Sequence, residues 1–443
     1  MTDLHRPLRS LRQGNWFKLI CGASYQHLPA VRSLVLAYAL AGADCIDVAA
    51  DPAVIHAAQS ALRSAMSLQK SAQQRGFPMD GLPWLMVSLN DGEDPHFRKA
   101  EFNPVYCPPD CSRPCEKVCP AQAIVFSRGT DRAPGHVDKL SEREFSGDLS
   151  DEFSGVIDDQ CYGCGRCVPI CPYDRISTRS YVFAPAAVAP LVLSGVDAVE
   201  IHTQIGRLAD FKRLWQAIEP FVPTLKLIAI SCPDGEGYID YLWALHDVIS
   251  PLPCALIWQT DGRPMSGDIG NGATAAAVKL GQKALSANLP GYIQLAGGTN
   301  SYTVSKLKSL GLLAPYFDSD PTVSEPAKTI AGIAYGSYAR TLLAPILEQL
   351  EQSLDRSVKS NVAQSDFESN SELNSGSSFV SLPVAEVKHN LGQNFDDLEA
   401  KAALQREAVL HLEDSELLWK AVRTAHTLVS QIKQPMTAFA PSG

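Results

Sequence analysis

Short apolar runs alternate with longer helical patterns along most of this 443-residue sequence. The pattern predicts three strands before residue 91 and five after residue 183, at 16–23, 44–50, 84–89, 198–202, 226–231, 255–259, 292–296 and 330–335. It predicts helices between and after these strands, at 28–40, 52–73, 208–218, 239–248, 273–287, 303–310 and 338–351. Because eight βα units close a parallel barrel, we expect a (β/α)8 TIM-like barrel. An open doubly wound sheet has the same alternation and is the alternative.

Two short segments of this alternation resemble each other. Residues 42–48 and 195–201 share the scheme glycine, small residue, aspartate, any residue, apolar, acidic, apolar. Repeated βα units explain this similarity without a functional role.

The barrel pattern is interrupted once and then followed by a different composition. We expect the first part of the barrel at 14–90, an inserted ferredoxin-like α+β module at 91–183, and the second part of the barrel at 184–352. Residues 353–393 are rich in Ser, Asn, Glu and Gln, which predicts a flexible linker. Residues 394–443 have helical apolar spacing, which predicts an amphipathic helical tail that packs on the barrel or binds a partner. Since the module follows a barrel strand, it should lie beside any pocket on the C-terminal face.

The strongest chemical signal is a cysteine run inside this insertion. Its spacing of two, two and three intervening residues, followed by proline, is that of bacterial ferredoxins: Cys161, Cys164, Cys167, Cys171 and Pro172. Three thiolates on one tight loop can hold a cluster, and Gly163 and Gly165 let the backbone approach it in unusual conformations. The proline then turns the chain so that the fourth cysteine faces a different cluster.

A second run also ends in Cys-Pro but has three residues in each gap: Cys107, Cys111, Cys115 and Cys119. In two-cluster ferredoxins the fourth cysteine of each run binds the other cluster. We therefore predict two 4Fe–4S clusters, one on Cys107, Cys111, Cys115 and Cys171 and the other on Cys161, Cys164, Cys167 and Cys119. The irregular spacing leaves open a 3Fe–4S or labile cluster at the first site. Zinc is the alternative metal, although zinc sites usually present separated CxxC pairs.

The other four cysteines lie in apolar, strand-like surroundings. We expect Cys21, Cys45, Cys232 and Cys254 to be buried and inert, because unpaired cysteine is among the most buried residue types.

The barrel pattern also suggests a ligand site. Gly297, Gly298 and Thr299 follow the seventh expected strand, and Gly336 and Ser337 follow the eighth. In barrels these two loops commonly hold a phosphate group, so a flavin or a phosphorylated small molecule could bind here. Otherwise these glycines only turn the chain. Further polar residues at expected strand ends are Asp47, Asp51, Asn90, His202, Asp234, Gln259 and Asp261.

Composition excludes several classes of partner. The formal net charge of −10 gives no reason to expect nucleic-acid binding or anionic lipid binding. Residues 1–13 lack the apolar core of a secretory signal, and the apolar stretch 184–196 is short and broken by Pro185, Pro190 and Gly195. We expect no transmembrane segment and a cytoplasmic location.

Beyond the cysteine runs, two further stretches are distinctive: Trp16-Phe-Lys-Leu-Ile-Cys-Gly22 and Gly42-Ala-Asp-Cys-Ile-Asp-Val-Ala-Ala-Asp51. With the two runs they resemble the light-dependent period family of cyanobacteria, over approximately residues 10–350. The resemblance implies an iron–sulfur protein that reports cellular redox state to the circadian clock, with the clock input kinase and the Kai proteins as partners. It also implies that the eight clustered cysteines are the functional residues.

Two functions are consistent with these features. The first is a redox-sensing or electron-transfer protein that acts through protein contacts. The alternative is an iron–sulfur, flavin-dependent oxidoreductase that acts on a small molecule at the C-terminal face of the barrel. No nucleophile–base pair or acid pair stands out by spacing, so we predict no catalytic residue and favour the first function.

Overall fold

The computed structural model describes residues 6–92, 97–119, 121–126, 154–180, 185–262, 272–313, 329–353 and 412–433. The chain forms two compact units, residues 1–342 with 422–443 and residues 343–421. The expected linker lies outside the described residues except for residue 353. Of the expected helical tail, only 412–433 is described.

Eight parallel strands close into a barrel in the order β1-β12-β11-β10-β9-β8-β3-β2. They are β1 (Trp16–Ile20), β2 (Cys45–Ala49), β3 (Trp84–Asn90), β8 (Ala198–His202), β9 (Leu227–Pro233), β10 (Ala255–Asp261), β11 (Tyr292–Ala296) and β12 (Ile330–Tyr335). The first and last strands pair, and β3 pairs with β8 across the insertion. The predicted barrel is confirmed, and the open sheet is wrong.

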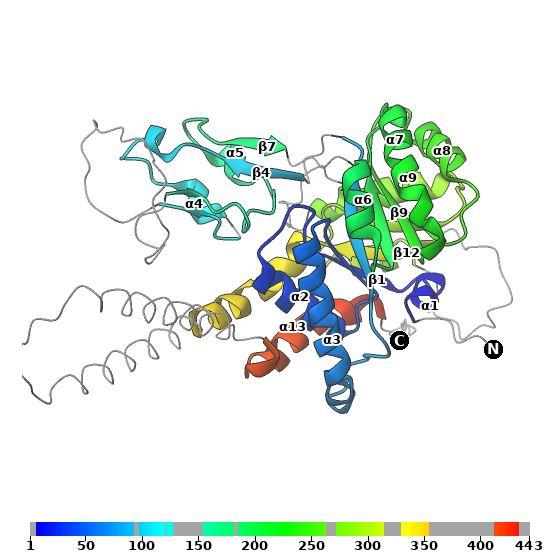
Figure 1. Ribbon diagram of the computed structural model, residues 1–443, viewed down its shortest axis with the longest axis horizontal. Helices are drawn as coiled ribbons and strands as arrows, with labels where there is room; N and C mark the ends of the chain where they lie inside the picture. Colours follow the sequence, from blue (N-terminus) through cyan, green and yellow to red (C-terminus); the bar gives the residue numbers. More distant parts are fainter. Residues whose placement is uncertain are drawn as a thin grey trace, which may run out of the picture. The chain divides into compact units, whose positions relative to one another are not determined.

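Helices surround these strands (Figure 1). Those next to the barrel strands in sequence are α2 (Leu28–Ala41), α3 (Pro52–Gln74), α6 (Pro185–Leu193), α7 (Leu208–Ile218), α8 (Tyr238–Ile249), α9 (Ala273–Ser286) and α10 (Thr303–Ser309), with a 3-10 turn η3 (Glu219–Thr224) and a helix over 337–353. The side chain of Asp51 accepts hydrogen bonds from the N–H groups of Ala53 and Val54, and Pro52 occupies the first helical position. These are standard start signals, which is why α3 begins where the sequence predicts.

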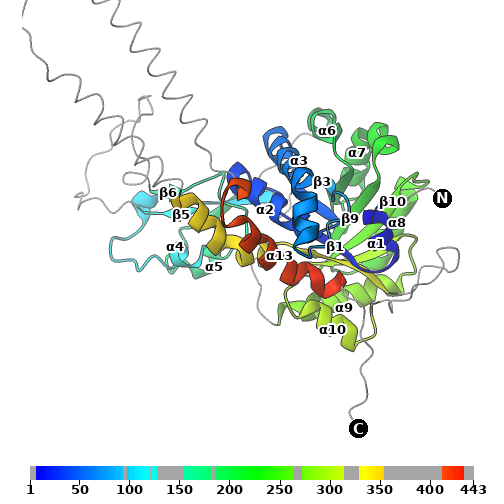
Figure 2. The same ribbon diagram turned by 90° about the horizontal axis from the view of Figure 1, so that it is seen from below.

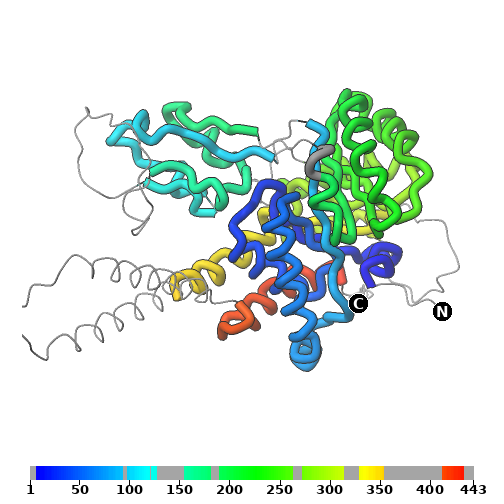
Figure 3. The backbone as a smooth tube through the Cα atoms, viewed as in Figure 1, coloured from blue at the N-terminus to red at the C-terminus, as the bar shows by residue number. Residues whose placement is uncertain are grey.

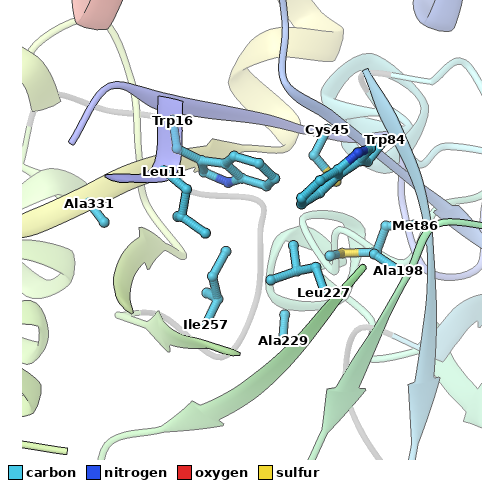
Figure 4. Close-up of a cluster of buried hydrophobic side chains, with 10 residues drawn as sticks. All are labelled: Leu11, Trp16, Cys45, Trp84, Met86, Ala198, Leu227, Ala229, Ile257 and Ala331. Carbon is cyan, nitrogen blue, oxygen red and sulfur yellow. The ribbon is translucent and has the colours of Figure 1, made fainter. Parts of the chain in front are cut away.

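The sequence reading missed two short helices. The apolar stretch at 184–196 contains α6 despite its internal Pro190. The N-terminal residues contain α1 (Arg6–Arg12), whose Leu11 is only 1% exposed. Leu11 packs into the N-terminal end of the barrel interior, against Trp16, Trp84 and other apolar side chains (Figure 4). The first helix therefore closes the floor of the barrel.

The two similar segments have the same structural role. Asp44 precedes β2 and accepts a hydrogen bond from the N–H of Phe17, at 2.7 Å. Asp197 precedes β8 and accepts one from the N–H of Leu85, at 3.0 Å. Each aspartate thus connects the start of one barrel strand to the second residue of a neighbouring strand. In both segments the glycine two residues before the aspartate has a positive φ. Their similarity belongs to the barrel architecture.

The C-terminal part of the described chain contains η4 (Leu412–Asp414) and α13 (Leu418–Lys433). From Val422 onward this helix belongs to the same unit as the barrel (Figure 2). The His426 ring lies edge-on to Phe77, with centroids 5.5 Å apart. Lys433 bonds the side chains of Ser10 and Asp44. Across the described ranges, no helix is long and apolar enough to cross a membrane.

The chain leaves the barrel after β3 and returns before α6 (Figure 3). The intervening segment contains β4 (Arg98–Glu101), η2 (Pro104–Tyr106), α4 (Pro114–Val118), β5 (Ile124–Val125), β6 (Gly155–Val156), α5 (Cys167–Ile170) and β7 (Ser177–Ser180). The first strand pairs with the last and the two middle strands pair with each other, all antiparallel. Two βαβ halves thus follow each other along the chain. The identification of this segment as a ferredoxin-like module stays a prediction.

Candidate functional site

Cysteines from both runs line one small cavity in the inserted segment. The four are Cys119, Cys161, Cys164 and Cys167, the set that the sequence assigned to one cluster. Burial and the neighbouring thiols of Cys164, Cys161 and Cys119 raise the pKa of Cys167 to about 12. The fold therefore brings the last cysteine of the first run to the first three of the second.

The loop that carries these cysteines depends on glycine. Gly163 and Gly165 have φ values of 70° and 72°, as the sequence predicted. A Cβ on Gly163 would lie 2.0 Å from the carbonyl oxygen of Arg98, so the loop packs directly against the backbone of β4. A side chain at this position would clash with that backbone and strain its own.

The two runs end in the same local structure. The N–H of Gln122 bonds the carbonyl of Cys119, and the N–H of Asp174 bonds the carbonyl of Cys171, at 3.2 and 3.3 Å. Both Gln122 and Asp174 have a positive φ near 50°. The following N–H groups donate to the sulfur atoms of the same two cysteines, at 3.3 and 3.4 Å. This repetition gives the two halves a local pseudo-symmetry.

The remaining four cysteines also interact across the two runs. Burial raises the pKa of Cys115, and the nearby thiols of Cys171 and Cys111 raise it further. Burial and the thiols of Cys111 and Cys115 likewise raise the pKa of Cys107. The structure therefore brings Cys171 to the buried cluster that contains Cys115, with Cys107 and Cys111 near Cys115.

The chemistry of the cavity fits an iron–sulfur cluster. Four thiol groups meet apolar neighbours, including Ala100, Ala123 and Ile124. The N–H groups of Ala100 and Ala123 donate to Cys161 and Cys119, and such bonds to cluster sulfurs tune reduction potentials. Within the described ranges, no three His, Cys, Asp or Glu side chains are close enough to hold one metal ion.

Of the four cysteines outside the runs, three are buried as expected, and the prediction is wrong for Cys254. Cys21, Cys45 and Cys232 are fully buried and Cys254 partly so. Burial raises the pKa of Cys21 to about 12 and that of Cys254 to about 11.

Tyr162, between two cysteines of the second run, reaches the barrel. Its ring lies 5.7 Å from that of Tyr25 and 4.1 Å from the guanidinium carbon of Arg340. The buried ammonium of Lys99 on β4 also joins the two parts, through the side chain of Gln26 at 2.8 Å and the carbonyl of Asp158 at 2.7 Å. The cysteine loop thus lies at the C-terminal mouth of the barrel.

The glycine-rich residues singled out at the ends of the last two strands all line one cavity at this mouth. They are Gly297, Gly298, Thr299, Gly336 and Ser337, joined by Tyr162 and Arg340. The cavity measures about 60 Å³, whereas pockets for drug-sized ligands measure roughly 300–1,000 Å³. Residues 263–271 and 314–328 lie outside the described ranges, so a flavin at this face stays a prediction.

A buried polar network lies below the cavity. Lys18 pairs with Glu200 and lies 3.4 Å from Asp47, whose other oxygen accepts from Ser88 at 2.8 Å. Burial raises the pKa of Asp47 to about 7, although the Lys18 charge opposes this shift. Burial also opposes the charge of Glu200, yet Lys18 and His202 hold its pKa well below the usual value.

The structure separates the polar strand-end residues into two groups. Asp47, His202, Gln259 and Asp261 line the mouth cavity. The others do not: Asp51 caps α3, Asn90 accepts a bond from the N–H of Gly92, and Asp234 pairs with Lys283. The sequence reading missed Lys18, Glu200, Tyr162 and Arg340. The signal for the first two was a charge in the middle of an apolar strand, which in a barrel indicates an inward side chain.

A closed βα barrel with paired cysteine sets in an insertion after its third strand defines a class, the barrel protein with an iron–sulfur module. Residues 107–182 match the LdpA Fe–S cluster-binding domain, and residues 191–431 match the light dependent period A C-terminal domain. The protein "Light dependent period A" of Synechococcus elongatus is 48% identical over 347 residues, which cover 78% of this chain and 86% of that protein. The chain belongs to the light-dependent period A family.

A solved structure is also similar in part. It is the (S)-3-O-geranylgeranylglyceryl phosphate synthase of Thermoplasma acidophilum with sn-glycerol-1-phosphate, aligned over 77% of this chain and 92% of that one. The identity is 14% and the TM-score is 0.26.

Proposed function

We propose that this protein is a redox sensor or electron carrier with two 4Fe–4S clusters, acting in the cytoplasm on the circadian clock through protein contacts. One cluster is held by Cys107, Cys111, Cys115 and Cys171, the other by Cys119, Cys161, Cys164 and Cys167. The observation that carries the proposal is the meeting of Cys119 with the second run around one cavity. That exchange of the fourth ligand is the arrangement of two-cluster ferredoxins.

Bound clusters would supply one-electron chemistry. The surrounding residues of the chain would influence the reduction potential of each cluster. The apolar neighbours of the cysteines keep water from the cavity, and backbone N–H groups bond the sulfurs. Both factors influence the reduction potential. Changes in cluster charge would then alter the surface next to them.

That surface offers a place for a protein partner. Large apolar side chains are exposed beside the first cysteine set: Val105 at 83%, Tyr106 at 67%, Ile170 at 44% and Tyr173 at 42%. Val105 and Tyr106 precede Cys107, and Ile170 precedes Cys171. Exposed apolar groups of this kind are typical of contact sites. The clock input kinase and the Kai proteins are the partners we propose.

Metal analysis of single variants tests the cluster assignment. The full chain, purified without oxygen, should contain about eight iron and eight sulfide per molecule, as two 4Fe–4S clusters require. Cys167→Ser and Cys119→Ser should each remove about half of the iron and the same EPR signal. Cys171→Ser should remove the other signal. Fewer irons at the first site in the unaltered chain would indicate the 3Fe–4S or labile form.

The matched control is Cys232→Ser, a buried cysteine outside both runs, which should retain all the iron. A colourless preparation containing zinc would contradict the proposal, as would equal iron loss in the Cys232 and Cys167 variants. The flavin-dependent oxidoreductase is the second candidate, because the residues predicted for it do line one cavity. Flavin released from the purified protein on heating would favour it.

A further inference from the structure

We propose that the barrel mouth is a binding site for a small oxyanion, a carboxylate or phosphate group of a small metabolite. Arg340 and the loops after β11 and β12 would hold the anion, next to Tyr162 of the cysteine loop. The site is separate from the cysteine sets and does not require that the clusters carry electrons.

Arg340 is the central observation. It is only 7% exposed and lines the mouth cavity. Its guanidinium donates to the carbonyls of Ile20 and Cys21, at 2.8 and 3.2 Å, and to the hydroxyl of Ser337, at 3.0 Å. Its Nε has no hydrogen-bond partner among the described residues, and no carboxylate in those ranges pairs with it. All three groups it bonds are neutral.

A buried guanidinium stays charged, because arginine does not lose its proton in proteins. Burying a charge is costly unless an opposite charge compensates it. Within the described ranges, nothing anionic is bonded to Arg340. An anionic ligand in the cavity would supply the missing charge and accept a bond from the free Nε–H.

The loops around Arg340 favour the same chemistry. Gly297 and Gly298 have φ values of 65° and 101°, left-handed conformations that glycine adopts without strain and that anion-binding loops often use. The helix over 337–353 begins at the cavity, directly after Gly336. The first N–H groups of a helix have no partner within it and carry partial positive charge, so they attract anions.

Other residues that line the cavity limit what the rest of the ligand can be. They are Asp47, His202, Gln259 and Asp261. Carboxylate oxygens there would repel a second anionic group and accept bonds from hydroxyl or amino groups. The volume of about 60 Å³ admits only a small group. The best fit is thus a small carboxylate or phosphate compound that also carries a hydroxyl or amino group.

Isothermal titration of the anaerobically purified full chain tests this site, with glycolate and inorganic phosphate as separate probes. At least one probe should bind saturably. Arg340→Gln should weaken that binding at least ten-fold, and Arg340→Lys should weaken it less because the charge is kept. The matched control is Arg213→Gln, since that side chain is 70% exposed and pairs only at the surface with Asp210.

Because Arg340 also bonds the backbone at the end of β1, its replacement could disturb folding. Hydrogen exchange on the unaltered chain avoids this problem: the bound probe should slow exchange in peptides covering 297–299 and 336–340. Binding of glycolate alone assigns a carboxylate, and binding of phosphate alone assigns a phosphate group. If neither probe binds, or if exchange at both loops is unchanged, the inference is wrong. Binding by a chain that holds no iron would overturn the proposed function and leave this site standing.

Discussion

The two ends of the barrel interior are built from the same eight strands but filled with different side chains. The N-terminal end holds two tryptophans, Trp16 and Trp84, with Met86, Leu227 and other apolar groups (Figure 4). The C-terminal end, two to four residues further along the same strands, holds Lys18, Asp47, Glu200, Gln259 and Asp261, all at most 5% exposed. Apolar burial at the floor stabilises the fold, whereas buried charge at the mouth costs free energy. Such a cost is typical of a functional site.

The largest effect should come from the floor. Trp84 is 4% exposed and contacts Trp16 edge-on, with ring centroids 5.9 Å apart. Trp84→Ala should lower the free energy of unfolding by about 4 kcal/mol, because it removes buried apolar area and leaves a cavity. Chemical denaturation measures this loss. The control is Trp243→Ala on the outer face of α8, where the side chain is 38% exposed. Equal losses of unfolding free energy in the two variants would show that the buried tryptophan stabilises the fold no more than the partly exposed one.

At the mouth, Glu200→Gln should lower the free energy of unfolding by about 3 kcal/mol, since it removes the nearer carboxylate of the buried Lys18 ammonium and leaves only Asp47, at 3.4 Å. Unlike the loss at the floor, this one should be reversible by a second change. Adding Lys18→Met removes the poorly compensated charge and should recover most of the stability. A double variant as unstable as Glu200→Gln would show that the mouth depends on packing, as the floor does.

The smallest effect, over the range pH 5 to 7, is a dependence on pH. Burial raises the pKa of Asp47 from 3.8 to about 7. The positive charge of Lys18 opposes this rise, and the negative charge of Glu200 adds to it. Between these values the folded protein holds a proton that the unfolded chain has released. Stability from this group therefore falls as pH rises, by at most about 1.4 kcal/mol per pH unit, and levels off above about pH 7.

Asp47→Asn cannot titrate, so its unfolding free energy should lack this slope between pH 5 and 7. Denaturation midpoints at several pH values measure the difference. Glu200 acts separately, because its lowered pKa confines its effect to pH below about 4.5. Identical slopes in both proteins would show that Asp47 is ionised throughout this range.

The sequence predicted the barrel well because each strand is a short apolar run next to a clear helix boundary. β8, β11 and β12 begin and end where expected. The 7-residue α1 was missed because it is too short for its periodicity to be recognised, and its role depends on a barrel floor that exists only after closure. The polar network was missed for the same reason: Lys18 and Glu200 are 182 positions apart, and only barrel closure brings them together.

The grouping of the cysteines could be predicted because the spacing within a run is set by the need to place three thiolates of one loop around one cluster. The glycines and the exchange of Cys119 followed from that spacing. Arg340 carried no such signal, since one arginine at the start of a helix is common on protein surfaces. Its burial and its contact with Tyr162 depend on the inserted segment and the barrel folding together.

One contact also bears on how the protein is made. The carboxylate of Asp44, fully buried at the start of β2, bonds the ammonium of Lys433 at the end of α13, 389 positions later in the chain. During synthesis on a ribosome, all eight barrel strands emerge before this cation does. A nascent chain thus carries a nearly finished barrel whose buried acid lacks its lysine, and a premature stop codon shortly before position 433 would fix that state permanently.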